Sequence, residues 1–134
     1  SGAGVLDMVI QWGTEDTPGH VINYMQGLPW QKPEAYPAAS PVFRLDKVRT
    51  PTIIHVGGAD ARCPPAHSRA LYRALRHYLD VPVELVVYPG EGHGLTTYEN
   101  RKAKMQWDLA WFDTHLGIED NVEQPAVNEQ AAAE

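Results

Sequence analysis

Residues 51–94 read PTIIHVGGADARCPPAHSRALYRALRHYLDVPVELVVYPGEGHG, and this stretch decides the fold. A short, β-branched apolar run follows Pro51, and a second apolar run covers 83–88. Both runs are typical of strands that are covered on both faces in a parallel sheet. Between them, apolar residues recur at helical spacing from Ala66 to Tyr78, which predicts a connecting helix. Such a strand–helix–strand unit places its two strands parallel to one another.

Each predicted strand runs into a glycine-rich loop that holds one titratable residue. Asp60 follows Gly57 and Gly58, and His93 lies in the sequence PGEGHG at 89–94. Because parallel strands end at the same edge of a sheet, the two side chains should lie close together. A carboxylate there can accept the imidazole Nδ1 proton, which leaves Nε2 as a general base. The alternative is structural: Asp60 caps the following helical region and His93 is a turn residue.

Three segments carry a family resemblance: SPVFRLDKVRTPTIIHVGGADARCPP, HSRALYRAL and VPVELVVYPGEGHG. Over about 1–117 the chain resembles the C-terminal part of the catalytic domain of the prolyl oligopeptidase family, especially its acylaminoacyl-peptidase-like members. These are serine peptidases with an α/β-hydrolase fold. The resemblance implies that Asp60 is the acid of the catalytic triad, that His93 is its base, and that Arg62 contacts substrate carbonyl groups. Two departures from the family pattern, at Val56 and Cys63, touch neither the acid nor the base.

The expected fold class is therefore α/β, the C-terminal half of an α/β-hydrolase with about three parallel strands and flanking helices. The first strand is predicted over 3–8, and 11–19 is predicted as a loop at the sheet edge that carries Asp60 and His93. The resemblance implies that this loop lines the specificity pocket, so that Trp12 contacts substrate; a packing role for Trp12 fits the sequence equally well. A last helix, predicted from Thr97 or Tyr98 to Gly117, has a broad apolar face suited to covering a sheet.

The family's nucleophilic serine lies in a G-x-S-x-G turn between a strand and a helix. The chain has three serines, Ser1, Ser40 and Ser68, and none has this context. Cys63 lies close to Asp60 in sequence, but no neighbour indicates the lowered pKa that a thiol nucleophile needs. We therefore expect a chain that carries the acid and the base without the nucleophile, and that has no peptidase activity on its own. Whether it is an enzyme is left open at this stage.

Composition places further bounds on the chain. With 134 residues, of which 43% are hydrophobic, one small domain over 1–117 is expected. Most of the net charge of −6 lies in 118–134, which predicts an acidic, disordered tail. The sequence has no apolar run of about 18 residues, so no membrane span is expected. The single Cys63 excludes an intrachain disulfide and fits a reducing, cytoplasmic setting.

No metal or cofactor is expected. The histidines lack partners at metal-ligand spacing, and the two prolines between Cys63 and His67 disrupt a helical pair of ligands. The arginines of the connecting helix, Arg69, Arg73 and Arg76, are interpreted as a solvated face, so no nucleic-acid role is expected.

A strand over Ala3 to Met8 would leave a row of backbone groups bare along its outer edge. A partner is therefore expected at this edge, either an N-terminal half of the same catalytic domain or a second copy related by two-fold symmetry. A homodimer is the favoured form. Two other interpretations remain open: a non-catalytic interaction module on the same scaffold, and part of a related esterase such as a dienelactone-hydrolase-like enzyme. The intact set of Asp60, Arg62 and His93 favours the peptidase.

Overall fold

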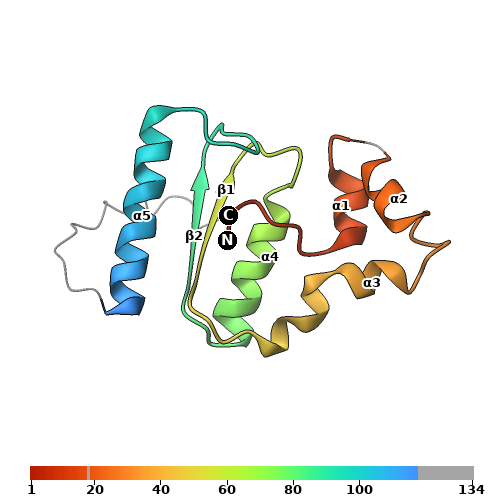
Figure 1. Ribbon diagram of the computed structural model, residues 1–134, viewed down its shortest axis with the longest axis horizontal. Coiled ribbons are helices and arrows are strands. Elements are labelled where there is room, and N and C mark those ends of the chain that lie inside the picture. Colours follow the sequence, from red (N-terminus) through yellow and green to blue (C-terminus); the bar gives the residue numbers. More distant parts are fainter. Residues whose placement is uncertain (18, 118–134) are drawn as a thin grey trace. The chain divides into compact units, whose positions relative to one another are not determined.

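The computed structural model describes residues 1–17 and 19–117, so the predicted tail over 118–134 lies outside the described residues. The chain divides into two units, the first formed by Ser1–Gly94 and the second beginning at Leu95. The first unit contains, in order, α1 (Met8–Thr14), α2 (His20–Met25), α3 (Ala35–Ala39), the 3₁₀ helix η1 (Pro41–Lys47), β1 (Thr52–Gly57), α4 (Ala66–Arg73), the π-helical turn η2 (Ala74–Tyr78) and β2 (Val83–Tyr88), as Figure 1 shows.

Strands β1 and β2 form a parallel pair, as predicted. Thr52 lies opposite Val83, and the register continues to the pair Gly57 and Tyr88. β1 is buried from its second residue to its end, as expected for a strand covered on both faces. Both strands run in the same direction in Figure 1, so the loops that carry Asp60 and His93 leave the same edge of the sheet. The α/β class predicted from the sequence is confirmed.

The first strand, predicted over 3–8, is wrong: none of these residues is paired in a strand. Within the described ranges the preceding residue, Gly2, makes an isolated parallel bridge with His55, on the side of β1 away from β2. The backbone N–H of Ala3 donates to the carbonyl of His55 at 3.0 Å. Ala3 then adopts a left-handed conformation with φ 42°, which is uncommon outside glycine and takes the chain off an extended path. The expected order, N-terminal segment, β1, β2, is retained.

Helix α1 occupies residues 11–14 of the segment predicted as a loop over 11–19. Asp7 is its N-cap: one carboxylate oxygen accepts the N–H groups of Val9 at 2.7 Å and Ile10 at 3.1 Å. Aspartate is among the strongest N-cap residues because it satisfies N–H groups that have no partner inside the helix. The loop therefore begins only at Glu15. The stretch 29–41 contains the short helix α3.

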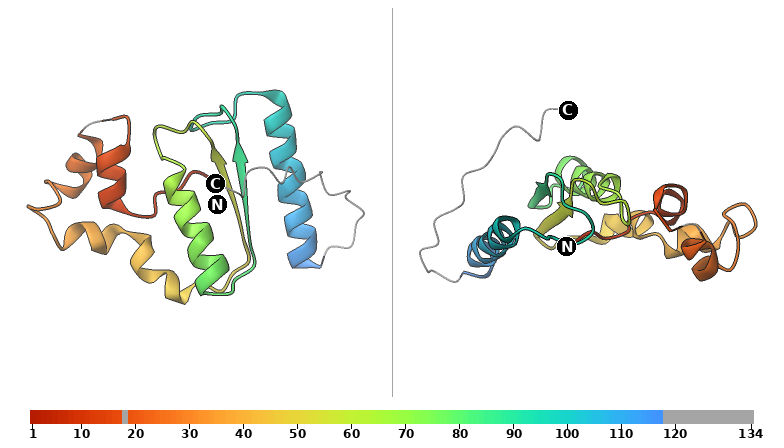
Figure 2. Two further views of the ribbon diagram at one scale, coloured as in Figure 1. Left: turned by 180° about the vertical axis from the view of Figure 1, so that it is seen from behind. Right: turned by 90° about the horizontal axis from the view of Figure 1, so that it is seen from above.

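Helix α4 packs on one face of the sheet (Figure 2, right). The core there is formed by Ile54, Leu75, Val81 and Val83. The helix is where the sequence predicts it, but Ala66 and Ala70 are exposed and Tyr78 is 79% exposed, contrary to the predicted apolar stripe.

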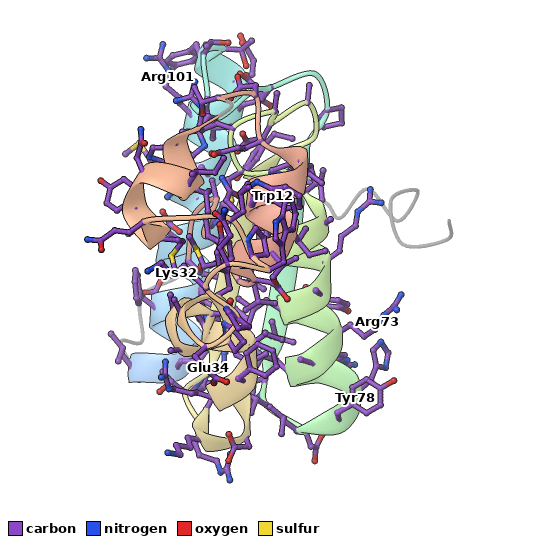
Figure 3. All side chains as sticks on the ribbon, turned by 90° about the vertical axis from the view of Figure 1, so that its right-hand side faces the viewer. Trp12, Lys32, Glu34, Arg73, Tyr78 and Arg101 are labelled. Atoms are coloured by element: carbon purple, nitrogen blue, oxygen red, sulfur yellow. The ribbon has the colours of Figure 1, made fainter. Side chains whose placement is uncertain are left out.

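The π turn explains the misplacement of Tyr78. The turn holds one extra residue, because the N–H of Leu79 bonds to the carbonyl of Ala74, five residues earlier. Tyr78 is therefore rotated away from the helix face that a period of 3.6 residues predicts for it. Figure 3 shows the Tyr78 and Arg73 side chains projecting outward from this helix.

The second unit contains α5 (Tyr98–Leu116), with the bounds that the sequence predicts. Thr97 caps its start by accepting the N–H of Asn100 at 3.4 Å. Gly117 follows its end with φ 70°, the left-handed conformation that favours glycine. The expected role of α5 as cover for a sheet stays a prediction. In the part of the chain that the structure describes, no helix is long and apolar enough to cross a membrane.

Candidate active site

Asp60 lies in the turn that directly follows β1. Its side chain is fully buried, and its Oδ1 accepts the backbone N–H groups of Arg62 at 2.9 Å and Cys63 at 2.8 Å. These two bonds are the local cap that the structural alternative predicts. They occupy only one carboxylate oxygen, so the other is free to face a second partner.

That second partner is His93. Its Nδ1 lies 3.0 Å from Asp60 Oδ2, and the imidazole is 55% exposed. Because Oδ2 is a carboxylate acceptor, the geometry favours the tautomer with the proton on Nδ1. Within residues 1–17 and 19–117, Nε2 of His93 makes no hydrogen bond. A half-exposed imidazole with a free Nε2 can take a proton from a nucleophile, and the buried carboxylate behind it stabilises the resulting imidazolium.

Close backbone contact fixes the two loops against each other. The N–H of Ala59 donates to the carbonyl of Glu91 at 2.9 Å, which ties the Asp60 loop to the His93 loop. A Cβ atom placed on Gly57 would overlap the carbonyl oxygens of Glu91 and Gly92. Glycine is therefore needed at this position for the His93 loop to lie where it does. The distance from acid to base is set by the backbone.

Arg62 lies beside the pair and is held from the segment around α1. Its Nε donates to Asp16 Oδ1 at 2.6 Å, and its carbonyl accepts Nε2 of the buried Gln11 at 2.7 Å. The backbone N–H of Asp16 also donates to the carbonyl of Ala61 at 3.0 Å. The hydrogen bond from Arg62 lowers the pKa of Asp16, and the same bond raises the pKa of Arg62. Gln11 and Asp16 were not predicted as site residues; the acidic pair at 15–16, in a segment placed at the site's edge, was the available signal.

Glu15 holds the segment between α1 and α2 in place. Its side chain is 2% exposed and accepts hydrogen bonds from Gln11 Nε2 at 3.0 Å and from the backbone N–H of Val21 at 3.3 Å; His20 Nδ1 lies 3.1 Å away. Burial alone would raise the pKa of this carboxyl, but the hydrogen bonds from His20, Gln11 and Val21 lower it overall. Because its buried carboxylate is satisfied by several donors, Glu15 stabilises the turn between α1 and α2.

Trp12 lies on helix α1 rather than in a loop (Figure 3). Its ring packs edge-to-face against Trp30, with centroids 5.6 Å apart and an interplanar angle of 86°. No hydrogen bond or ring contact joins it to Asp60, Arg62 or His93 among the described residues. The packing role of Trp12 is therefore visible, and its contact with substrate stays a prediction.

The other nucleophile candidates are poorly suited to the chemistry. Cys63 is 3% exposed, and burial, with the charges of Asp60 and Glu15, raises the pKa of its thiol to about 11. A thiol that is protonated at neutral pH is a weak nucleophile. Ser40 is fully buried and bonded to the backbone of Met8 and Tyr36, and Ser68 is buried on α4. In the described ranges no three His, Cys, Asp or Glu residues gather as metal ligands.

Solved structures with the same arrangement of elements are α/β-hydrolase peptidases. A puromycin hydrolase is 26% identical with a TM-score of 0.80, covering 91% of this chain and 19% of that one. An acylaminoacyl peptidase of Pyrococcus horikoshii is 20% identical with a TM-score of 0.76, covering 86% of this chain and 19% of that one. The fold of this chain is thus that of the α/β-hydrolases.

Sequence comparison narrows this class. The acylamino-acid-releasing enzyme of Rattus norvegicus is 35% identical over 78 residues, which are 58% of this chain and 10% of the rat enzyme. The profile of the prolyl oligopeptidase family matches residues 1–119. The chain belongs to the prolyl oligopeptidase family, as the resemblance in its sequence predicts. The matched residues span about a tenth of the length of the rat enzyme.

Proposed function

We propose that this chain supplies the acid and the base of a serine-peptidase catalytic triad, with Asp60 as the acid and His93 as the base. The observation that carries the proposal is the 3.0 Å contact between the buried Asp60 Oδ2 and the half-exposed His93 Nδ1. Family membership supports the reaction class, peptide-bond hydrolysis. The relatives named acylamino-acid-releasing enzymes suggest N-acylated amino acids or peptides as the substrate class.

In this mechanism, His93 Nε2 accepts the hydroxyl proton of a serine as the serine oxygen attacks the scissile carbonyl. Asp60 holds the imidazole in the required tautomer and stabilises its positive charge. His93 then gives the proton to the leaving amine. Arg62 contacts a substrate carbonyl, and Trp12 forms part of the pocket wall. The serine and the oxyanion donors come from a segment outside these 134 residues, since none of the three serines has the required setting.

The chain by itself is therefore inactive, because removing the nucleophile removes most of a triad's rate advantage. The test is an assay of the 134-residue chain with acetyl-alanine p-nitroanilide, where no turnover above buffer is expected. Turnover that a serine-directed phosphonate blocks would refute this. The coding sequence immediately upstream of Ser1 provides the second arm. It should encode a G-x-S-x-G segment, and co-expression of that region should give activity that Asp60→Asn and His93→Asn remove.

The proposed partner covers the N-terminal edge of the sheet. Along the outer side of β1 only Gly2 forms a bridge, and among the described residues the N–H groups of Gly4 and Val5 make no hydrogen bond. An upstream half would pair here, and a second copy would do so when the chain is alone. Light scattering at micromolar concentration should show a dimer. A compact monomer would contradict the homodimer. The free, buried Cys63 thiol supports a cytoplasmic setting.

A non-catalytic interaction module is the second candidate, and the unsuitable settings of Ser1, Ser40 and Ser68 favour it. The upstream sequence separates the two: a start codon there, with no serine turn, would favour the module.

A further inference from the structure

The way Arg62 is held leaves one side of its guanidinium group uncommitted. Nε is bonded to Asp16 Oδ1, whereas the two terminal nitrogens make no hydrogen bond within residues 1–17 and 19–117. A guanidinium group presents those two nitrogens as a planar fork that matches a carboxylate, or a single carbonyl oxygen, in geometry. Arg62, which carries this fork, lies two positions after Asp60 in the chain. Asp60 is in turn bonded to His93, so the fork belongs to the same loop as the acid of the proposed pair.

We propose that Asp16 is a positioning residue for substrate recognition: it fixes Arg62 through Nε and so presents the terminal nitrogens to a carbonyl or carboxylate oxygen of an acylated amino acid or peptide. The inference rests on the proposed function, because it assigns the role of Arg62 in the same site. Asp16 itself touches no substrate. Its two links to the Asp60 loop, one from its side chain and one from its backbone N–H, act on the geometry of that loop.

Stability alone gives little reason for this ion pair. The Arg62 and Asp16 side chains are 47% and 45% exposed, and ion pairs with such exposure contribute little to the free energy of unfolding. An exposed arginine without a partner samples many rotamers, and fixing one of them on binding costs conformational entropy. A bond already made at Nε removes part of that cost. The buried Gln11, bonded to the Arg62 carbonyl, holds the backbone of the same residue.

Two effects of Asp16 act in opposite directions on an anionic ligand. As a positioning residue, Asp16 strengthens binding, so its removal weakens binding. Through its negative charge, Asp16 repels an anionic ligand, so its removal tightens binding of that ligand. A neutral ligand removes the charge effect and reports positioning alone.

The first measurement needs no ligand. In the full chain, the ¹⁵N relaxation of Arg62 Nε–H should show an ordered side chain. Asp16→Ala should make it mobile, and Asp16→Asn, which keeps an amide oxygen as acceptor, should restore part of the order. The matched control is Asp46→Ala, which removes the same charge from an exposed position elsewhere. A mobile Arg62 in the unaltered chain, or an ordered one in Asp16→Ala, would overturn the inference.

The second measurement titrates the full chain with neutral N-acetyl-alanine methylamide, followed at the Arg62 and His93 resonances. Asp16→Ala should weaken binding about two- to five-fold, the range that an exposed ion pair supplies, and Asp46→Ala should leave it unchanged. Equal binding of this neutral ligand in Asp16→Ala and Asp46→Ala would contradict positioning. If Arg62→Ala binds as well as the unaltered chain, the proposed substrate role of Arg62 is wrong. If only Arg62→Ala weakens binding, the positioning role alone fails.

Discussion

Substitution of Gly57 by alanine should damage both the fold and the acid–base pair. The new Cβ would overlap the backbone oxygens of Glu91 and Gly92, and backbone atoms cannot turn aside as a flexible side chain can. The His93 loop must therefore move away from the end of β1. That movement breaks the 2.9 Å bond between Ala59 N–H and the Glu91 carbonyl, and it pulls His93 Nδ1 away from Asp60.

The size of the effect follows from these contacts. Overpacking in a filled interior costs about 1–3 kcal/mol. Each lost hydrogen bond adds about 0.5–1.5 kcal/mol. Alanine also stabilises the fold by up to about 1 kcal/mol, because it lowers the conformational entropy of the unfolded chain. Gly57→Ala should thus lower the free energy of unfolding by about 2–5 kcal/mol, a large part of the total for a small domain.

Urea denaturation of the full chain, read by circular dichroism, gives this difference from the shift in midpoint at constant slope. The matched control is Gly94→Ala, since a Cβ there meets no atom within 4 Å. In the folded Gly57→Ala variant, the Nδ1–H resonance of His93 should also exchange faster with water, because the contact with Asp60 is lost. If Gly57→Ala unfolds within about 0.5 kcal/mol of Gly94→Ala, the ordinary range for harmless substitutions, the argument from close approach is wrong.

Three further predictions concern titratable groups. Asp60→Asn should abolish the preference of His93 for the Nδ1–H tautomer, seen in its imidazole ¹⁵N shifts, because an amide can donate as well as accept; an unchanged tautomer would count against the pairing. Cys63 should react slowly with a disulfide reagent at pH 8 and rapidly in urea, because burial raises the pKa of the folded thiol to about 11; equal rates in both conditions would mean an accessible thiol. The pKa of Glu15 is lowered in the folded state, so its carboxylate contributes stability above its unfolded pKa that is lost as the pH falls through the folded pKa. The difference in stability between the unaltered chain and Glu15→Gln should therefore shrink on acidification, and a gap that widens towards low pH would refute the sign.

Much of the fold between 51 and 117 could be predicted because local signals there agree with each other. The two β-branched runs, the glycines after them and the Thr97 and Gly117 boundaries of α5 all matched the structure. The N-terminal segment could not be predicted in the same way. The segment 3–8 reads as a strand, yet the left-handed Ala3 ends the pairing after Gly2, and the capping carboxylate of Asp7 begins a helix at Met8. Neither effect changes the apolar pattern of the sequence, so periodicity alone could not show where the strand pairing ends and helix α1 begins.

Some residues of the candidate site could likewise be predicted from the sequence, and others could not. Asp60 and His93 could be predicted because each follows a strand directly, so topology alone brings them to one edge. Gln11 and Asp16 could not, because their contacts with Arg62, 51 and 46 positions away in sequence, depend on where helix α1 ends. The expected contact of Trp12 with substrate depends on the same misplaced loop.

The structural and the catalytic interpretations of Asp60 turn out to be compatible, because a carboxylate has two oxygens. Oδ1 is held by the N–H groups of Arg62 and Cys63, and Oδ2 faces His93. The cap keeps the carboxylate ordered in a fully buried position, where an acceptor without fixed donors would be costly. The same two bonds leave Asp60 no freedom to rotate away from the imidazole. Nothing else in the described site orients the half-exposed imidazole of His93, so the local turn that fixes Asp60 also supports the proposed role of the pair.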